Sequence, residues 1–407
     1  MSEASRPENA AQVEDAVKSA LSAGMPLEIL GRGTKRGLGR PMQTAARLDL
    51  SALRGITLYE PEELVMSALA GTPISEIEAA LAEKRQQLAF EPADYGPLYG
   101  AEANAGTIGG VFACNLSGPR RFKAGAARDH LLGVKAVSGR GESFKTGGRV
   151  VKNVTGYDLC KLLAGSYGTL AAMTEVTFKV LPAGEKTRTV LLFGLSDRIA
   201  VEVMGAAAST PHEVSGIAHV PHPITRRIGV NIIARAGAGV TALRVEGPAP
   251  SVAARLYGLT MEFGKRAAFD EITGHASGVF WRQIRDANVF AAEKHRPLWR
   301  LSVPPATAAA VIERIRERLG AGIEWYYDAA GGLIWLSVLG EASAEAVRAS
   351  LVPGGGHATL IRAADAVRAA QPVFHPQDEA LAALTRRIKT GFDPQSLLNP
   401  GRMYPGA

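Results

Sequence analysis

The chain has 407 residues, 46% of them hydrophobic and 21% charged, a length that predicts two or three domains rather than one compact core. Its formal net charge of +7 raises nucleic acid as a partner, but the arginines are dispersed and often follow glutamates, and no basic tract carries interleaved aromatic residues. The composition therefore argues against nucleic-acid binding, and an anionic cofactor or an acidic protein partner accounts equally well for the positive charge.

The two cysteines, Cys114 and Cys160, lie far apart, and neither belongs to a CxxC motif. This chain therefore cannot supply the ligands of a four-cysteine iron–sulfur cluster or zinc site. No apolar run is long enough to span a bilayer, and residues 1–9 lack the basic-then-apolar order of a signal peptide. We expect a cytoplasmic protein that reaches the inner face of the membrane only through partners.

The first elements lead into a glycine-rich loop. Apolar spacing predicts a helix over residues 11–23 that ends at Gly24, and residues 26–30 predict a short strand. The loop Gly31-Arg32-Gly33-Thr34-Lys35-Arg36-Gly37 follows and matches neither the Rossmann nor the Walker A pattern. Its glycines nevertheless let successive N–H groups approach a diphosphate, and its polar residues add a hydroxyl and cations. A solvated basic turn is the alternative.

The next elements are expected to be structural. Residues 58–70 predict a strand, Thr72 suits the N-cap of a helix, and Pro73 suits its first position. Small and polar residues then fill the segment 105–120, where Thr107, Asn115 and Ser117 could bond the edges of a large flat ligand. A Gly-Tyr-Asp turn at 156–158, a second turn at 165–168 and a strand over 174–180 complete this region.

These motifs, in this order, resemble one family. The glycine loop, Thr107-Ile108-Gly109-Gly110, Arg128-Asp129 and Gly168-Thr169 look like the FAD-binding domain of the vanillyl-alcohol-oxidase (PCMH) type, found in D-lactate and D-2-hydroxyglutarate dehydrogenases. The resemblance covers roughly residues 10–182, and residues 392–402 are similar to the family's closing motif. Arg32 and Tyr167, where relatives often have Gly and Glu, point more narrowly to the FAD-binding subunits of bacterial glycolate oxidase, in particular those of the E type.

The resemblance implies which residues bind FAD. The first loop would hold the diphosphate, the segment 107–118 would follow the ribityl chain and isoalloxazine, and residues 168–176 would contact the adenine side. No histidine lies in either glycine loop, so we predict non-covalent FAD. The residues assigned to the cofactor are Gly31, Arg32, Gly33, Thr34, Lys35, Arg36, Gly37, Pro92, Thr107, Gly109, Gly110, Asn115, Ser117, Gly118, Arg128, Asp129, Gly168, Thr169, Val176, Asn399 and Arg402.

The expected fold class is α+β. A PCMH-type two-subdomain FAD-binding domain would occupy residues 1–182, an α+β cap domain residues 183–365, and a C-terminal helical segment returning to the flavin residues 366–407. In the cap, we expect strands at 190–193, 217–220 and 227–233 with a helix at 197–208. Residues 299–361 then predict the order β-α-β-β-α-β of a ferredoxin-like fold.

The catalytic signals are weaker. Relatives that oxidise D-2-hydroxy acids carry a histidine-rich metal motif in the cap, but the corresponding stretch 326–335 has no histidine, and His219 and His222 supply only two ring ligands. We therefore predict no metal site. Arg282 and Arg285 are three residues apart and could share a helix face toward a carboxylate, or simply face solvent; with Lys389, they are the catalytic candidates.

Three interpretations stay open. In the first, the chain is a flavoprotein subunit of a glycolate-oxidising complex, an FAD-dependent oxidoreductase in which a paralogous flavin subunit oxidises the substrate and an iron–sulfur subunit receives electrons. In the second, it is a complete D-2-hydroxy-acid dehydrogenase with an unusual cap site. In the third, it is a scaffold subunit that binds FAD without redox turnover.

Overall fold

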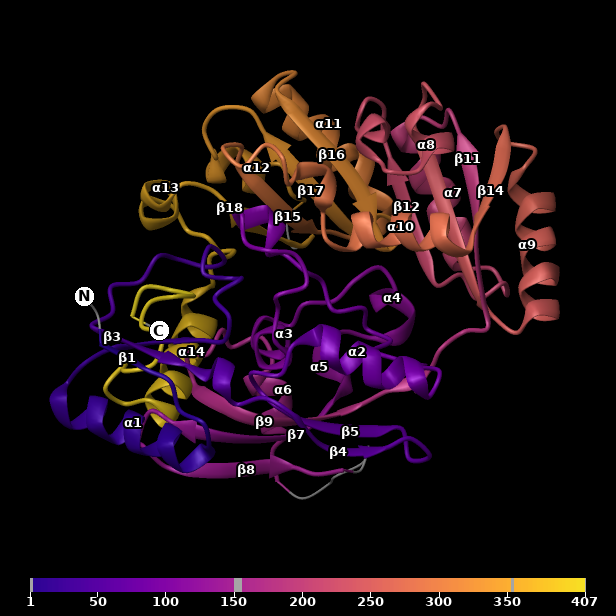
Figure 1. Cartoon of the computed structure of the whole chain (residues 1–407). Helices are drawn as coiled ribbons and strands as arrows, with labels where there is room; N and C mark the ends of the chain where they lie inside the picture. The colour runs from indigo at the N-terminus through magenta and orange to yellow at the C-terminus, as the bar shows by residue number, and fades with distance from the viewer. Residues whose placement is uncertain (1–2, 150–155, 353–354, 407) are drawn as a thin grey trace. The chain divides into compact units, whose positions relative to one another are not determined.

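The computed structural model describes residues 3–149, 156–352 and 355–406 of the chain (Figure 1). The chain forms two compact units. The first comprises residues 1–117, 125–182 and 368–407, and the second comprises residues 118–124 and 183–367. No helix among the described residues is long and apolar enough to cross a membrane.

The first unit begins with a small parallel sheet of order β1-β3-β2, in which β1 is Glu3–Ser5, β2 Leu27–Leu30 and β3 Ala46–Asp49. Helix α1 (Ala10–Ala23) buries Val13 and Val17 in the same core as Leu48. Asn9 caps its first turn by accepting from the N–H of Gln12, and Gly24 ends it in the left-handed region at φ 61°. The predicted helix is thus confirmed.

A five-stranded antiparallel sheet, of order β4-β5-β9-β7-β8, forms the rest of the first unit's framework. The predicted strand over 58–70 is instead two strands, because Leu64 turns the chain at φ 57°. The strands are β4 (Ile56–Glu60), β5 (Val65–Leu69), β7 (Leu131–Ser138), β8 (Ser143–Gly147) and β9 (Ala171–Lys179), and β6 (Gln86–Gln87) pairs separately with β10 (Leu181–Pro182).

Helix α2 (Ile74–Glu83) starts one residue later than predicted. Pro73 occupies the N-cap position, and the Thr72 hydroxyl donates to the carbonyl of Leu69 at 2.7 Å instead of capping the helix. The remaining helices of the first unit are α3 (Ile108–Cys114), α5 (Ala127–His130), α6 (Leu159–Leu163) and α14 (Glu379–Phe392).

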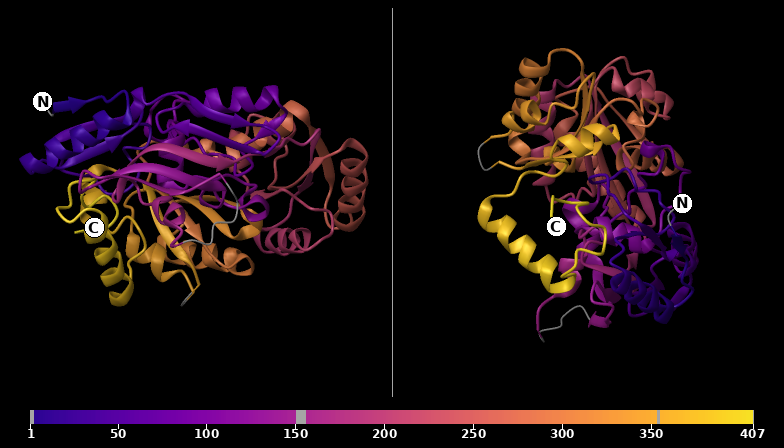
Figure 2. Two further views of the ribbon diagram at one scale, coloured as in Figure 1. Left: turned by 90° about the horizontal axis from the view of Figure 1, so that it is seen from below. Right: turned by 90° about the vertical axis from the view of Figure 1, so that its left-hand side faces the viewer.

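The closing segment after α14 lies against the N-terminal sheet (Figure 2). Leu398 bridges to Leu27 of β2 in parallel, with the N–H of Leu27 donating to the Leu397 carbonyl at 2.8 Å and the N–H of Asn399 donating to the Leu27 carbonyl at 3.0 Å. Leu397 and Leu398 are buried among α1 and β2. The two ends of the chain therefore build one wall of the first unit.

The second unit is an eight-stranded antiparallel sheet of order β14-β11-β13-β12-β16-β17-β15-β18, covered by helices (Figure 1). Its chain runs twice through the order β-α-β-β-α-β. The first half is β11 (Lys186–Phe193), α7 (Asp197–Ala208), β12 (Gly216–Val220), β13 (Val240–Gly247), α9 (Ala249–Phe263) and β14 (Phe269–Thr273). The second half is β15 (Leu298–Ser302), α11 (Ala308–Leu319), β16 (Ile323–Asp328), β17 (Leu333–Val338), α12 (Ala344–Ala349) and β18 (His357–Arg362).

Each half has the strand order fourth-first-third-second of a ferredoxin-like sheet, and the halves meet where His219 of β12 pairs with Tyr327 of β16. The ferredoxin-like order predicted for residues 299–361 is confirmed, whereas the repeat in the first half was not predicted. The predicted strand at 227–233 is wrong. That stretch holds a 3-10 turn (Ile224–Arg227) and α8 (Asn231–Ala234), because Val240–Gly247 takes the position between β11 and β12.

Helix α10 (Gly274–Arg285) connects the two halves and packs against β11 and β14. Helices α4 (Arg121–Ala124) and α13 (Asp365–Ala370) lie where the chain passes between the two units.

Candidate cofactor-binding site

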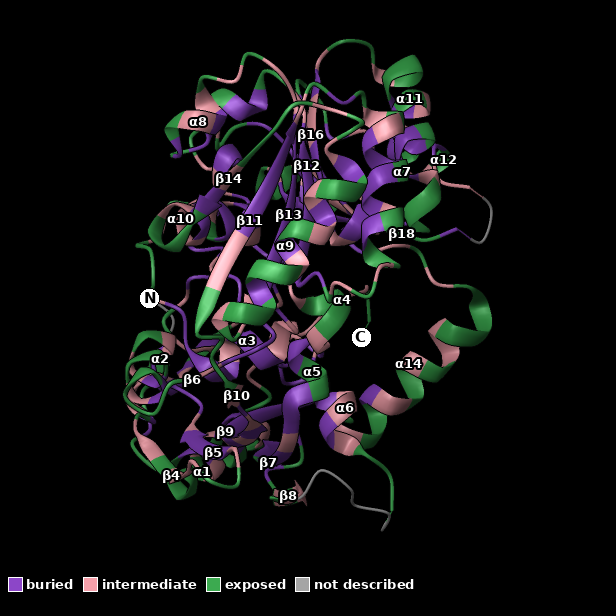
Figure 3. Ribbon diagram, turned by 90° about the vertical axis from the view of Figure 1, so that its right-hand side faces the viewer, coloured by how far each residue is buried: buried purple, intermediate pink, exposed green. Residues whose placement is uncertain are grey.

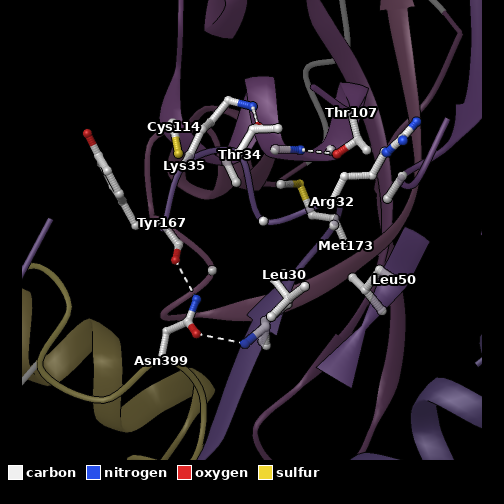
Figure 4. A pocket seen from close by; sticks show the side chains of 18 of the residues that line it. Leu30, Arg32, Thr34, Lys35, Leu50, Thr107, Cys114, Tyr167, Met173 and Asn399 are labelled. Carbon is white, nitrogen blue, oxygen red and sulfur yellow. Dashed lines mark hydrogen bonds between the residues drawn. The ribbon is translucent and has the colours of Figure 1, made fainter. Parts of the chain in front are cut away.

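A cavity in the first unit collects the glycine-rich loop, the start of α3, the turn at Tyr167-Gly168 and the closing segment (Figure 4). About 700 Å³ of space lies between these segments, part of it open to solvent. The lining residues are Ile29, Leu30, Gly31, Arg32, Gly33, Thr34, Lys35, Arg36, Leu50, Ala70, Thr107, Gly109, Gly110, Ala113, Cys114, Tyr167, Gly168, Ala171, Met173, Asn399 and Arg402.

Two glycines allow these segments to approach each other. A Cβ on Gly31 would lie 2.6 Å from the Oγ1 of Thr107, and a Cβ on Gly109 would lie 2.7 Å from the Cβ of Ala70. Thr107 itself caps α3 by accepting from the N–H of Gly110. The start of α3 therefore lies against the first loop at Gly31 and against Ala70, after β5, at Gly109, because neither glycine has a side chain.

The cations of the glycine-rich loop differ in their partners. Arg36 donates two hydrogen bonds of 2.7 Å to the buried carboxylate of Glu28, so its charge is compensated. Lys35 is buried, and its ammonium donates to the Oγ1 of its neighbour Thr34 at 3.2 Å. Burial lowers the pKa of Lys35. The charges of Cys114 and Asp94 oppose this shift, and the charge of Arg402 adds to it.

Arg402 adds a second buried cation from the closing segment. It donates from Nη2 to the Lys35 carbonyl at 2.9 Å, while its buried Nε has no hydrogen-bond partner within the described residues. Neither Lys35 nor Arg402 forms a salt bridge with a carboxylate in the described part of the chain. A buried positive charge without a counter-ion is costly, so the arrangement suits an anionic ligand.

Asn399 connects two backbone segments that line the cavity. Its Oδ1 accepts from the N–H of Ile29 at 2.8 Å, and its Nδ2 donates to the carbonyl of Tyr167 at 2.7 Å (Figure 4). Gly168 has φ 71°, and a Cβ there would lie 2.8 Å from the Asn399 Nδ2. This amide therefore shapes the site by binding two backbone segments at once.

Lys389 occupies a structural position in the same unit. Its buried ammonium donates to Asp393 at 2.6 Å, to the Thr169 carbonyl at 2.7 Å and to the Leu398 carbonyl at 3.0 Å. Burial lowers the pKa of Lys389, and the Asp393 carboxylate opposes that shift. The side chain holds the closing segment to the turn at 166–169.

Cys114 and Tyr167 line the cavity but were not predicted as site residues. Burial raises the pKa of the Cys114 thiol, and the positive charges of Arg402 and Lys35 oppose the shift. Tyr167 has φ 56°, a conformation uncommon for a residue with a side chain, and its ring meets Phe374 edge-on. The departure of Tyr167 from the family pattern was the one sequence signal for this position.

Twelve of the residues assigned to FAD from the sequence line this cavity, and nine do not. Among the nine, Asn115 accepts from the N–H of Arg128 at 2.9 Å and Ser117 accepts from the N–H of Ala127 at 2.8 Å, so both side chains serve the turn before α5. Their contact with the cofactor stays a prediction. The residues outside the lining are Gly37, Pro92, Asn115, Ser117, Gly118, Arg128, Asp129, Thr169 and Val176.

The other catalytic candidates lie in the second unit, on α10. Arg285 donates two hydrogen bonds, of 2.7 and 2.8 Å, to Asp286, and Arg282 occupies the preceding turn. His219 is buried, with Nδ1 at 2.8 Å from the hydroxyl of Thr241 and Nε2 at 3.6 Å from Asp197. Across the described residues, we find no group of three or more His, Cys, Asp or Glu side chains that could hold a metal ion.

Comparison with known proteins agrees with the character of the cavity. Residues 4–147 match the family described as FAD binding domain. The chain is 34% identical over 389 residues to glycolate oxidase subunit GlcE of Escherichia coli, a match that covers 95% of both chains. It is also 33% identical to a D-lactate dehydrogenase of Archaeoglobus fulgidus, over 44% of this chain and 38% of that protein.

A further relative and one solved structure complete the comparison. Glycolate oxidase subunit GlcD of Bacillus subtilis is 36% identical over 115 residues, which cover 28% of this chain and 23% of that protein. The 4-ethylphenol oxidase of Gulosibacter chungangensis superposes with a TM-score of 0.72 at 13% identity, over 99% of this chain and 89% of the other. The latter likeness concerns the fold, and it confirms the predicted PCMH-type α+β architecture.

Proposed function

Because the chain belongs to the family of glycolate oxidase subunit GlcE, a family of FAD-dependent oxidoreductases, we propose that it is the FAD-binding subunit of a complex that oxidises glycolate to glyoxylate. In this proposal, a paralogous flavin subunit oxidises the substrate, and an iron–sulfur subunit receives the electrons. FAD, when bound, supplies the capacity to accept and pass on those electrons.

One observation carries the assignment of FAD to the cavity. Lys35 and Arg402 are buried and lack a carboxylate partner among the described residues, while Arg36 beside them is neutralised by Glu28. A diphosphate supplies the missing negative charge, and the glycines of the loop leave the backbone N–H groups accessible to it. Lys35 and Arg402 would bind the diphosphate, and Asn399 would orient the loop that receives it. The residues present thus fit the cofactor.

The chain's own composition supports a dependence on partners. Its two cysteines, Cys114 and Cys160, cannot supply the ligands of a four-cysteine iron–sulfur cluster, so the cluster that receives electrons in this proposal belongs to another subunit. The similarity to GlcD of Bacillus subtilis supports a paralogous flavoprotein as the subunit that oxidises the substrate. Assembly in the cytoplasm, at the inner face of the membrane through those partners, is part of the same proposal.

A self-sufficient D-2-hydroxy-acid dehydrogenase is the second candidate. The similarity to the D-lactate dehydrogenase of Archaeoglobus fulgidus favours it, and Arg282 or Arg285 would then hold the substrate carboxylate. However, Arg285 is already paired with Asp286, and Lys389 with Asp393. A scaffold role without redox turnover is the third candidate.

The test is an anaerobic titration of the purified chain with glycolate and then D-lactate, followed in the visible spectrum. We expect an oxidised-flavin band that neither substrate bleaches, that dithionite bleaches, and that glycolate bleaches once the paralogous flavin subunit is added. Prompt bleaching of the isolated chain by either substrate would instead identify a dehydrogenase in its own right. A band that never responds to glycolate in the complex would favour the scaffold.

A further inference from the structure

The side chain of Lys35 lies in surroundings that do little to compensate its charge. The residue is 8% exposed, and its ammonium donates to the Oγ1 of Thr34 at 3.2 Å. Its Nζ lies against the segment before α3 and the first turn of that helix, because a Cβ on Gly106 would be 3.3 Å from it and a Cβ on Gly110 3.5 Å. Among the described residues, no carboxylate forms an ion pair with this ammonium.

The walls of the cavity add little that could solvate a charge. Strands β5 and β9, which lead into it, are largely buried (Figure 3). Ala70 follows β5, Ala171 and Met173 belong to β9, and all three residues line the cavity. Because apolar surroundings penalise the charged form of an amine, these walls favour the neutral form of the lysine more than water does.

Charged groups on three other segments act on the Lys35 ammonium. Arg402 of the closing segment carries a second positive charge and donates to the Lys35 carbonyl at 2.9 Å. The negative charges of Asp94, whose carboxylate accepts from backbone N–H groups, and of Cys114, when it is ionised, favour the protonated amine. Arg36 in the same loop is neutralised by its own carboxylate partner. Burial is the largest of these influences, and it lowers the pKa of Lys35.

We propose that the chain takes up a proton at Lys35 when FAD binds, so that loading of the cofactor depends on pH. The inference rests on the proposed function, which assigns FAD to this cavity. A diphosphate brings negative charge to the amine, and negative charge favours the ammonium form. A side chain that is partly neutral in the flavin-free chain is therefore fully protonated in the loaded chain. The amine accepts this proton from solvent, and no covalent bond to the cofactor forms.

Thermodynamic linkage gives the direction of the pH dependence. Because the ammonium form binds the diphosphate more tightly, FAD raises the pKa of Lys35 above its value in the flavin-free chain. The affinity for FAD is then fully present below the flavin-free pKa and falls as the pH rises above it. Riboflavin lacks the diphosphate and should cause no such uptake, whereas any ionisation of the isoalloxazine is common to both ligands.

The experiment counts the protons that are bound on loading. Calorimetric titrations of the flavin-free chain with FAD and with riboflavin are made between about pH 7 and about pH 10, in two buffers that differ in ionisation enthalpy. They give the affinity and the number of protons at each pH. Lys35→Arg keeps the positive charge but does not release its proton in this range, and Lys35→Met has no proton to bind. Cys114→Ser removes the thiol that lines the same cavity.

For the unmodified chain, we expect at least about half a proton per FAD at about pH 10, and a loss of about twofold or more in FAD affinity from about pH 7 that riboflavin does not share. Cys114→Ser should retain this proton uptake, and both Lys35 variants should lose it. Uptake that persists in Lys35→Arg or Lys35→Met, or that disappears in Cys114→Ser, would assign the proton to another group and overturn the inference while leaving FAD binding intact. If the unmodified chain binds no FAD at any pH, the cofactor assignment itself fails.

Discussion

The two units differ in the partners of their buried positively charged side chains. In the second unit, Arg296 donates to the carboxylates of Glu293 and Glu324, and Arg120 forms two 2.7 Å hydrogen bonds with Glu246. In the first unit, Lys35 and Arg402 line a cavity without a carboxylate partner in the described residues. From this difference we infer that a buried cation paired with a carboxylate stabilises the fold, whereas a buried cation without a counter-ion indicates a binding site for an anionic ligand.

The largest effect is expected from removing the carboxylate partner of Lys389, a buried lysine of the first unit. Asp393→Ala leaves the Lys389 ammonium buried without its carboxylate and removes the acceptor of the Leu397 and Leu398 N–H groups. We expect the free energy of unfolding to fall by about 3–5 kcal/mol in denaturant titration. The double variant Lys389→Met/Asp393→Leu should lose less than Asp393→Ala, and a larger loss in the double variant would show that the pair is not what stabilises the closing segment.

A somewhat smaller effect is expected in the second unit from Glu246→Gln. Glu246 accepts from Arg120, from Ser215 at 2.6 Å and from Thr187 at 3.2 Å, and its neutralisation would leave Arg120 and Arg244 without their carboxylate. We expect a loss of about 2–3 kcal/mol with FAD affinity unchanged. Weaker FAD binding in this variant would mean that the charges of the two units are not independent.

The carboxylate of Glu246 also predicts how the free energy of unfolding depends on pH. Despite the cost of burial, Arg244 and Arg120 hold the pKa of Glu246 well below its usual range. A depressed pKa contributes stability that is fully present above the unfolded value, about 4.3, and is lost as the pH falls below it. Between about pH 5 and about pH 3, the unmodified chain should therefore lose stability more steeply than Glu246→Gln. Parallel curves would contradict this assignment.

The smallest effect is expected from replacing Arg36, a cation of the cavity lining whose charge is compensated by Glu28. Arg36→Gln removes a half-exposed charge whose partner Glu28 keeps a second arginine, Arg47, at 3.4 Å. We expect a change of less than about threefold in FAD affinity, measured by flavin fluorescence, because a neutralised cation adds little attraction for the diphosphate. A large loss would mean that pairing with Glu28 does not decide which cations bind the cofactor.

Local patterns predicted much of the fold. The helix over 11–23, the ferredoxin-like order over 299–361 and the glycine-rich loop follow from spacing and turn chemistry that are read along the chain. The stretch 227–233 alternates apolar and polar residues like a strand, yet it forms turns because Val240–Gly247 occupies the available place in the sheet. Strand competition of this kind depends on tertiary pairing, which no local pattern records.

The candidate site, like the fold, was predicted from the sequence only in part. Motifs located Lys35, Asn399 and Arg402, but the sequence did not reveal that Asn399 binds both Ile29 and Tyr167, since these residues are brought together only by the fold. Cys114 was missed because only the fold places the C-terminal end of α3 beside the cavity, and a lone cysteine carries no motif. The hydrogen bonds of Asn115 and Ser117 to the turn before α5 were equally invisible in the sequence.

The most direct test of the account compares the affinity of the flavin-free chain for FAD and for riboflavin, in the unmodified form and in Lys35→Met. Riboflavin lacks the diphosphate, so it separates attraction by the cation from packing of the isoalloxazine. We predict that Lys35→Met weakens FAD binding by roughly tenfold or more and changes riboflavin binding by less than about twofold. Unchanged FAD affinity, or equal losses for both ligands, would contradict the claim that this uncompensated cation holds the cofactor's diphosphate.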